Sequence, residues 1–362
     1  MRAGLLWVAV AGVGCGTSAG PPPDGSSPRF TTPITGAPYE TVFYGAYVDH
    51  GGAEPTDYRC GFKAYPGHRG VDILLRNFLV QDSGVTVIAA AAGQVASTAD
   101  GNPDRSTTRG SGGLGNHVVL DHGGGYRTYY GHLRRGSVQV AVGANVAAGA
   151  PLGLVGSSGD SNWPHLHFAV TWDLVWVDPF AGACNQGAAG LWASQLEYQD
   201  RFMVMDAGVA ISGATTLAQI LERPPTVGSV PATTPSVVFW AEALNIRADS
   251  FRVDVRRVGG EVAVRLERGR TTTFSTIVLG LLVPVAGSLE PGDWEMELWV
   301  KPFGENYRRE YRQPITVTGT SAALVGAPRA PAAVLWLDGE PAAGYRLALP
   351  RAAASAADSA RE

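Results

Sequence analysis

Short runs of apolar and β-branched residues, separated by glycine-rich turns, make up most of the region between residues 39 and 180. The runs at 116–122 and 126–132 are joined by three consecutive glycines, which is typical of a hairpin. Further runs occupy 85–90, 151–156 and 165–172. No stretch of useful length there repeats its apolar positions with the 3.6-residue period of a helix. The pattern therefore predicts an all-β domain over residues 39–185.

Strand signals return between residues 236 and 318, alternating apolar and polar positions with turns at regular spacing. They predict a second domain at 233–318, a β-sandwich of immunoglobulin-like type. The connecting region at 186–232 is less regular and has one short helix signal at 215–223. An Ala/Pro-rich tail follows at 319–362, in which residues 334–337 are apolar enough to dock as one more strand. The length of 362 residues agrees with two mostly β domains plus tails.

The N-terminus has the pattern of an export signal. Arg2 precedes an apolar stretch at 5–13 that is too short to span a bilayer, and Gly14 and Cys15 follow. We interpret residues 1–15 as a lipoprotein-type signal peptide and Cys15 as the lipidated residue, which would be the only membrane contact. Ordinary secretion, or an apolar start without an export role, are the alternatives. Residues 16–38 are rich in Gly, Ser, Pro and Thr and predict a flexible linker.

The charge of the chain gives information about only one class of partner, nucleic acid. The net charge is −4, and no basic cluster is visible, so nothing indicates nucleic-acid binding. The charge does not identify the partner, and the sequence leaves the oligomeric state open.

Two short motifs contain three of the seven histidines and one aspartate, all residue types that bind metals. His68 and Asp72 are four residues apart, and His165 and His167 are two apart, so in extended chain each pair shares a face. Imidazole nitrogens and a carboxylate oxygen are ligands that zinc takes in open, catalytic sites. The set exceeds what a three-ligand site needs and leaves a histidine for proton transfer. The alternative is that these are unrelated surface or core residues.

Three motifs follow one another in order: H-x-G-x-D at 68–72, G-H-L at 131–133 and H-L-H-F at 165–168. With the segments 87–95, 115–123, 126–133 and 143–156, they resemble the lysostaphin/LytM-type zinc endopeptidases, metallopeptidase family twenty-three. The resemblance covers roughly residues 46–181, about two fifths of the chain. It implies a LytM-like antiparallel β-sheet peptidase domain, one zinc ion, and a peptidoglycan peptide as substrate.

The resemblance also implies a role for each matching residue. His68, Asp72 and His167 fall on the zinc ligands, and His132 and His165 on the two other active-site histidines. Three protein ligands leave one position for a water molecule, whose pKa falls toward neutrality on zinc. His132 and His165 would then supply a base for that water and a donor to the developing oxyanion. Which histidine is the base stays open. No H-E-x-x-H motif occurs, so a glutamate base on a helix is not expected.

The remaining histidines have weaker claims to the site. His117 and His122 flank a predicted strand, and we expect them to have structural roles in the hairpin rather than to bind metal. His50 precedes the first motif, and we expect a loop or surface role, with contact to the metal in a latent form as the alternative.

Other segments are expected to form the walls of a substrate groove. Tyr129 and Tyr130 adjoin His132, so at least one should line the groove, although cross-strand packing explains both equally well. Trp163 and Pro164 directly precede His165 and are expected to shape a groove wall. The Gly/Ser/Thr-rich insertion at 100–115 is expected to arch over the groove as a mobile loop.

Two cysteines remain after Cys15. Cys60 lies eight residues before His68, and Cys184 lies seventeen after His167, so both fall near one end of the domain if the motifs meet at one metal. In an oxidising compartment a Cys60–Cys184 disulfide is the natural pairing. Two unpaired buried thiols are the alternative.

These observations predict an exported zinc metalloendopeptidase that hydrolyses peptide bonds of peptidoglycan stem peptides or cross-bridges. It would act in the periplasm or cell envelope, lipid-anchored or else secreted. The alternative is a catalytically inactive LytM-like domain that binds or activates a cell-wall amidase. The second domain has no metal-binding cluster, so a chain ending near residue 230 is expected to retain hydrolysis of a small soluble peptide.

Overall fold

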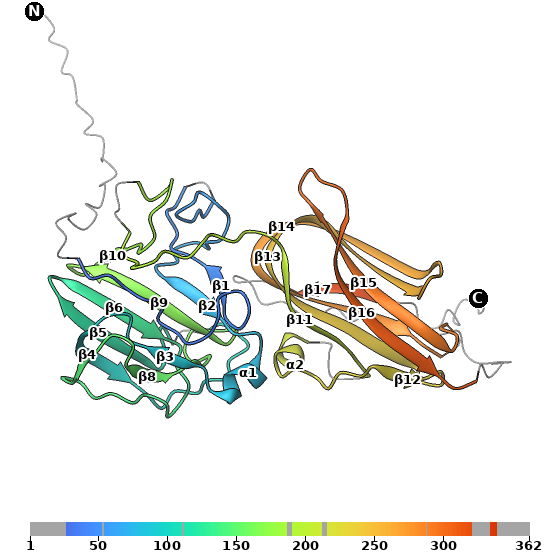
Figure 1. Ribbon diagram of the computed structural model, residues 1–362, viewed down its shortest axis with the longest axis horizontal. Helices are drawn as coiled ribbons and strands as arrows, with labels where there is room; N and C mark the ends of the chain where they lie inside the picture. The colour runs from blue at the N-terminus through green and yellow to red at the C-terminus, as the bar shows by residue number, and fades with distance from the viewer. Residues whose placement is uncertain are drawn as a thin grey trace, which may run out of the picture.

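The computed structural model describes residues 27–52, 54–110, 112–186, 190–211, 216–286, 288–320 and 334–338. The expected signal segment at 1–15 with Cys15, the first part of the linker and most of the tail lie outside these ranges. The described chain forms two β-rich halves that lie side by side (Figure 1). We call residues 27–200 the N-terminal domain and residues 203–338 the C-terminal domain. In the described residues, no helix combines the length and apolar character that crossing a membrane requires.

The N-terminal domain is built on an eight-stranded sheet with the order β1-β2-β9-β6-β5-β4-β7, in which β10 also pairs with β9. A two-stranded sheet, β3-β8, and one short helix, α1, complete it. The elements are β1 (Phe43–Ala46), β2 (Val71–Leu74), α1 (Phe78–Ser83), β3 (Thr86–Ile88), β4 (Gly93–Ala99), β5 (His117–Gly123), β6 (Tyr126–Gly131), β7 (Asn145–Val146), β8 (Pro151–Leu154), β9 (His165–Trp172) and β10 (Val175–Val177). The expected hairpin is present as β5 and β6, and the region is mostly β as expected, although the sequence pattern did not predict helix α1.

Strand β9 lies inside the sheet, between β2 and β6. Its alternating residues Leu166, Phe168 and Val170 are fully buried in the main core of the domain. Because neighbouring side chains on a strand point to opposite faces, His165 and His167 are placed together on the other face. The apolar alternation of β9 thus determines where its histidines lie.

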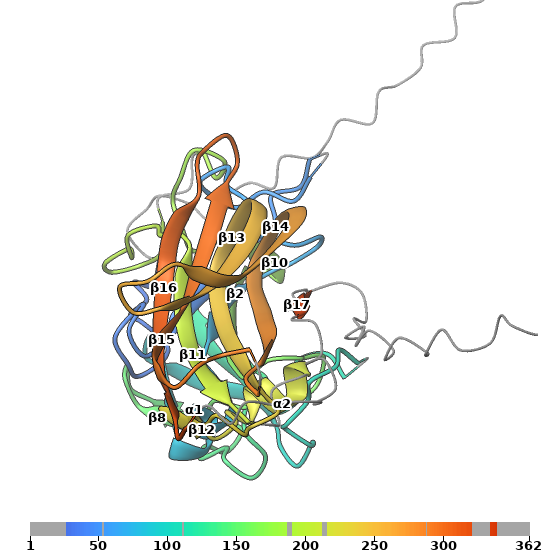
Figure 2. The ribbon, with the colours of Figure 1, turned by 90° about the vertical axis from the view of Figure 1, so that its right-hand side faces the viewer.

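The C-terminal domain contains one seven-stranded sheet with the order β12-β16-β15-β13-β14-β17, in which β11 also pairs with β13. Its elements are β11 (Met203–Ala210), α2 (Leu217–Leu221), β12 (Ser229–Pro231), β13 (Ser236–Arg257), β14 (Val262–Pro284), β15 (Gly292–Pro302), β16 (Arg308–Thr318) and β17 (Val334–Asp338). Figure 2 shows β16, β15 and β13 side by side. The strand expected at 334–337 is confirmed as β17, which pairs with β14.

The immunoglobulin-like part of the expectation is not confirmed. Strand β13 pairs with β11 along residues 238–244 and with β15 along residues 248–257. Because β14 occupies the other edge of β13, β11 and β15 lie one after the other along the same edge. A register shift between Ala248 and Ser250 lies at the start of the β15 pairing. Such irregularities bend a strand. A single hydrogen-bonded sheet therefore contains the strands that sequence periodicity assigned to two packed sheets.

The connecting region at 186–232 belongs in large part to the C-terminal domain. Strand β11 pairs with β13, and helix α2 lies within the helix signal at 215–223, with the Thr216 hydroxyl accepting a hydrogen bond from the Gln219 amide at 3.1 Å. The second sheet therefore begins about thirty residues before residue 233.

An apolar cluster joins the two domains. The N-terminal domain contributes Phe43, Leu74, Phe78 and Trp163, and the C-terminal domain contributes Met205, Ala210, Ile220, Leu221, Val238, Trp240 and Leu244. We call this set the interdomain core. Polar contacts border it, since Asp206 accepts hydrogen bonds from Asn77 and from Arg223, both at 2.9 Å. Burial of this many large apolar side chains indicates a fixed rather than a loose arrangement of the domains.

The disulfide prediction is confirmed: Cys60 and Cys184 are bonded across 124 residues of chain. The backbone of Cys184 also donates to the Tyr58 carbonyl at 2.9 Å. The bridge holds the loop that precedes His68 against the segment that follows β10.

Candidate metal centre

Three segments that are distant in sequence meet on one face of the N-terminal sheet. In the antiparallel pairing of β2 with β9, Asp72 lies directly opposite His167. In the pairing of β6 with β9, Gly131 lies opposite His167, so His132 follows at the end of β6 beside it. Directly opposed residues have Cβ atoms about 4.5–5.5 Å apart, and their side chains share a face. Strand register therefore brings the H-x-G-x-D, G-H-L and H-L-H-F motifs together.

The possible ligand atoms of His68, Asp72 and His167 all lie within 4.8 Å of one another. Asp72 Oδ1 is 3.1 Å from His68 Nε2 and 2.9 Å from His167 Nδ1, and the two nitrogens are 3.3 Å apart. A tetrahedral zinc ion with bonds of about 2.0–2.1 Å has ligand atoms about 3.3 Å apart. The separations and the His-Asp-His donor set therefore fit one zinc ion.

Second contacts orient the possible ligands. His68 Nδ1 donates to the Tyr47 carbonyl at 2.7 Å, which leaves the Nε2 lone pair for a metal. The Tyr65 hydroxyl donates to Asp72 Oδ2 at 2.9 Å, and its ring stacks on the His68 ring with centroids 4.2 Å apart. Tyr65 has no recognisable motif around it, and sequence reasoning missed it. The one sequence signal that could have found Tyr65 is its position three residues before His68.

Histidines 132 and 165 lie beside this group with their Nε2 atoms uncommitted to backbone. His132 Nδ1 donates to the Ser158 carbonyl and His165 Nδ1 to the Trp163 carbonyl, each at 2.7 Å. Because a carbonyl oxygen can only accept, both rings carry their proton on Nδ1 and present an Nε2 lone pair. The two ring centroids are 4.6 Å apart, and His165 Nε2 is 3.7 Å from Asp72 Oδ1.

The backbone of His132 adopts a left-handed conformation, with φ of 60°. A non-glycine residue in this region carries strain that the surroundings must hold in place. The His132 amide donates to the Leu114 carbonyl at 2.7 Å, and its ring bonds to Ser158. These contacts turn the side chain at the end of β6 toward β9 instead of away from the sheet.

Burial dominates the electrostatics of the group. It lowers the pKa of His132 well below the usual range, and the neighbouring His165 and His167 lower it further. Burial also lowers the pKa of His165, against the opposing effect of the Asp72 carboxylate. Burial opposes ionisation of Asp72, but the adjacent His68 and His165 outweigh it and hold the Asp72 pKa well below its usual range. Near neutral pH Asp72 is therefore a carboxylate, the form that binds a metal, and His132 and His165 are neutral imidazoles that can accept a proton.

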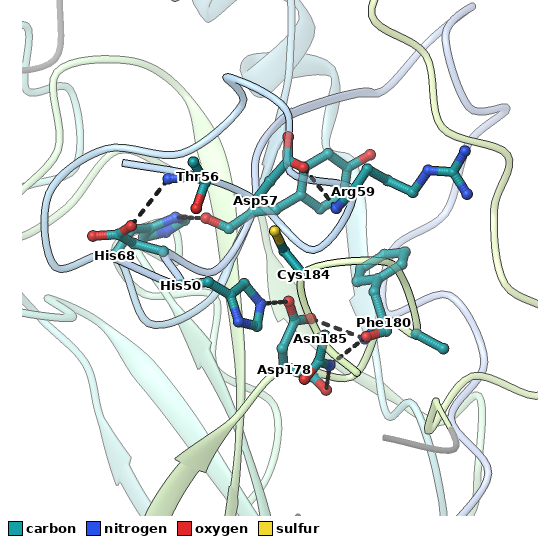
Figure 3. Close-up of polar contacts among 12 residues, drawn as sticks. His50, Thr56, Asp57, Arg59, His68, Asp178, Phe180, Cys184 and Asn185 are labelled. Atoms are coloured by element: carbon teal, nitrogen blue, oxygen red, sulfur yellow. Dashed lines mark hydrogen bonds and ion pairs between the residues drawn. The ribbon is translucent and has the colours of Figure 1, made fainter. Parts of the chain in front are cut away.

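The remaining histidines lie outside this group. His117 Nδ1 contacts the Gly115 carbonyl at 2.9 Å, and His122 contacts the Ala92 carbonyl and the Thr128 hydroxyl. His50 Nε2 contacts Asp178 Oδ2 at 2.8 Å, and Figure 3 shows its ring directed toward Asp178. Each of these rings holds a loop or a strand end in place.

The two tyrosines of β6 have different surroundings. Tyr130 is fully buried and its hydroxyl accepts from the Ala90 amide at 2.9 Å, so it belongs to the core. Tyr129 lies on the opposite face of β6, where its ring packs on Trp176 with centroids 5.0 Å apart. Of the pair, only Tyr129 is on the face that carries His165 and His167.

The expected groove segments both reach the centre. The Trp163 carbonyl holds His165, and the Trp163 indole donates to the Leu75 carbonyl at 2.7 Å. The insertion at 100–115 contacts the segment before β9, where the Gly110 amide donates to Asp160 Oδ1 at 3.1 Å. It also brings Arg109 to the centre, with the guanidinium 4.8 Å from the centroid of the Tyr65 ring. Sequence reasoning placed the loop here but missed this arginine.

Comparison with known proteins agrees with this geometry. The family model described as peptidase family M23 matches residues 66–179, which include all five residues of the centre. Residues 66–179 therefore form an M23-type domain, similar to the LytM-type peptidases that the three motifs resemble.

Individual relatives cover only part of the chain. One is DD-carboxypeptidase/endopeptidase Mpg of Neisseria meningitidis, 30% identical over 124 residues, which is 31% of this chain and 28% of that protein. Another is the murein hydrolase activator EnvC of Escherichia coli, 45% identical over 58 residues, 16% of this chain and 13% of that one. The chain thus spans less than a third of the length of these relatives. Among solved structures, the catalytic domain of lysostaphin from Staphylococcus simulans is 26% identical and covers 39% of this chain and 89% of that chain, with a TM-score of 0.26.

Proposed function

We propose that the protein is a zinc-dependent endopeptidase that hydrolyses peptide bonds of peptidoglycan stem peptides or cross-bridges. The proposal rests on one observation: the five side chains lie together, three as a His-Asp-His donor set at zinc spacing and two as histidines beside it that each present an Nε2 lone pair. Two relatives, the DD-carboxypeptidase/endopeptidase Mpg and the murein hydrolase activator EnvC, support a cell-wall substrate.

In this proposal His68, Asp72 and His167 hold the metal. A bound zinc ion would supply Lewis acidity, which makes a nucleophilic water available near neutral pH and polarises the scissile carbonyl. The side chains of Asp72, His165 and His167 are 8%, 8% and 13% exposed, so the centre is reachable from solvent. The enclosed position strengthens the electrostatic contacts a substrate would make there.

His132 and His165 would move the proton. Both present an Nε2 lone pair in the resting state, so each can accept a proton from the attacking water. Neither can donate to an oxyanion until it has been protonated. The histidine that takes the proton then becomes the acid for the leaving amine, while Ser158 or Trp163 holds its ring in place through the Nδ1–H bond. The geometry is symmetric in this respect, and the choice of base stays open.

The alternative is a domain that activates a cell-wall amidase without hydrolysing anything itself. Its support is the 45% identity to EnvC, although over 58 residues only. A complete set of ligands and proton-transfer residues serves no purpose in an activator, and this favours the enzyme.

The experiment compares the wild-type chain with His68→Ala and the matched control His117→Ala. Wild type and control are expected to hold one zinc per chain and to release stem-peptide fragments from purified sacculi, measured by mass spectrometry. His68→Ala is expected to lose both. If the wild type holds zinc and releases nothing, and all three proteins stimulate an added amidase equally, the activator alternative is correct.

We further propose that the protein is exported to the cell envelope. The Cys60–Cys184 disulfide supports this, because such bonds persist in oxidising compartments. Attachment through a lipid on Cys15 stays a prediction. The intact mass of the protein purified from membranes tests it, since cleavage before Cys15 and acylation give a defined mass.

A further inference from the structure

A positive charge borders the metal centre on the side of the insertion loop. The Arg109 guanidinium lies over the Tyr65 ring, which stacks on His68 and whose hydroxyl bonds to Asp72. The Tyr65 ring therefore contacts both Arg109 and His68, one of the three possible ligands. Burial and the Asp72 carboxylate raise the pKa of Tyr65 well above its usual range, whereas Arg109 acts in the opposite direction. The guanidinium is thus electrostatically close to the tyrosine hydroxyl and to the centre.

The loop that carries Arg109 is tied down at several points. The Ser106 amide donates to the Ser157 carbonyl at 3.2 Å, and the Ser157 hydroxyl donates back to the Ser106 carbonyl at 2.8 Å. The Asp160 amide donates to the Gly113 carbonyl at 2.9 Å. The loop is therefore held on both sides of Arg109 against the segment that leads into His165.

Arg109 differs from the other arginine on this loop. Arg105 forms ion pairs with Asp82, at 2.8 Å, and with Glu222. Arg109 is exposed, and no carboxylate in the described ranges forms an ion pair with it. Asp72, which bonds to the same tyrosine, is already surrounded by His68, His165 and His167. The charge of Arg109 is therefore available to a ligand that approaches the metal centre.

We propose that Arg109 binds a carboxylate of the substrate peptide next to the scissile bond and so selects acidic or C-terminal peptide substrates. The proposal rests on the proposed peptidase function for its substrate class. A guanidinium matches a carboxylate with two parallel hydrogen bonds, and the Tyr65 ring beneath it limits the directions the fork can take. The carboxylate has two possible sources: the free C-terminus of the peptide, or an acidic side chain.

Three probes separate the sources. They are N-acetyl-L-lysyl-D-alanyl-D-alanine, its C-terminal amide, and the amide in which the last residue is D-glutamic acid, so that its only carboxylate is on the side chain. Calorimetry on the zinc-loaded full chain gives the affinity of each probe, and mass spectrometry follows hydrolysis separately. The variants are Arg109→Gln, Arg109→Lys and Arg135→Gln, the last an exposed arginine in a turn that serves as the control for loss of charge.

The wild type and Arg135→Gln are expected to bind one of the carboxylate probes about 3- to 10-fold more tightly than the amide, as for a solvent-exposed charge pair with good geometry. Arg109→Gln is expected to lose this preference with unchanged zinc content, and Arg109→Lys to restore part of it. The tighter probe identifies the source. Equal affinity of the wild type for all three probes, or a preference that survives in Arg109→Gln, overturns the proposal. Because binding is measured apart from hydrolysis, a preference without hydrolysis contradicts the peptidase function and leaves Arg109 as a carboxylate site.

Discussion

Because the interdomain core connects the two domains, we expect a cavity-forming substitution in the C-terminal domain to weaken metal binding in the N-terminal domain. Trp240, on β13, is fully buried in this cluster together with Trp163 of the N-terminal domain. The Trp163 carbonyl accepts the hydrogen bond that orients His165. A cavity at Trp240 therefore removes packing from the cluster that holds the histidine loop.

The magnitude follows from the burial. Replacing a fully buried tryptophan by alanine lowers the free energy of unfolding by about 3–5 kcal/mol. The loss has two parts: the transfer free energy of the removed ring and the cost of the cavity that it leaves. For a chain of 362 residues, with an unfolding entropy of about 2.1 cal/mol/K per residue, such a loss lowers the melting temperature by about 4–7 °C. Trp299→Ala is the matched control: this residue is only half-buried on β15, under Arg252 and Arg309, and does not belong to the interdomain core.

The assay follows thermal unfolding with two probes, circular dichroism for the whole chain and a zinc indicator for release of metal. In Trp240→Ala both midpoints are expected to fall together, whereas in Trp299→Ala the zinc-release midpoint is expected to move by less. An unchanged zinc-release midpoint in Trp240→Ala, with a lower dichroism midpoint, would show that the domains unfold independently and that the reasoning is wrong.

The same core changes what we expect of a chain ending near residue 230. That chain lacks Trp240 and Leu244, exposes Trp163, and should hydrolyse even a small peptide more slowly.

Three further predictions concern the N-terminal domain. His132→Ala and His165→Ala should each keep zinc bound and reduce turnover by about 10²–10⁴-fold, measured as peptide release; a wild-type rate in either variant would place proton transfer elsewhere. Burial lowers the pKa of Lys63 to about 7, so between that value and its unfolded pKa the unfolded chain binds more protons, and stability should rise with pH. Melting temperatures between pH 7 and 9.5, below the ionisation of tyrosine, should therefore increase in the wild type and stay level in Lys63→Met. Cys184→Ser should lower stability by about 4–5 kcal/mol in the chain-entropy model, and a melting temperature equal to that of the wild type would show that the bridge with Cys60 contributes nothing.

Local spacing was sufficient to predict much of the site. Because side chains alternate along a strand, the two-residue spacing of His165 and His167 placed them on one face before any fold was known. The glycines between the apolar runs predicted the β5–β6 hairpin, and the positions of Cys60 and Cys184 relative to the motifs predicted their disulfide. The first two features depend only on residues close in sequence. The disulfide depends on one further condition, that the motifs around His68 and His167 meet at one metal.

Long-range pairing decided the rest. That Asp72 lies opposite His167 is a property of strand register, which no segment determines alone. Likewise, Tyr65 and Arg109 are ordinary residues in sequence, and they reach the centre only because two separate loops fold onto the same side of β2 and β9. The single C-terminal sheet also depended on which strands β13 meets along its two halves.

The sequence by itself determined the strands, the motifs and the kinds of atom offered to a metal, because period and residue type are local properties. Only the tertiary structure decided which atoms meet, how the histidine tautomers are set by the carbonyls of Ser158 and Trp163, and that Trp163 also packs against the second domain. The physical reason is that contacts between distant segments depend on the register and packing of the whole chain, which the spacing within any one segment does not encode.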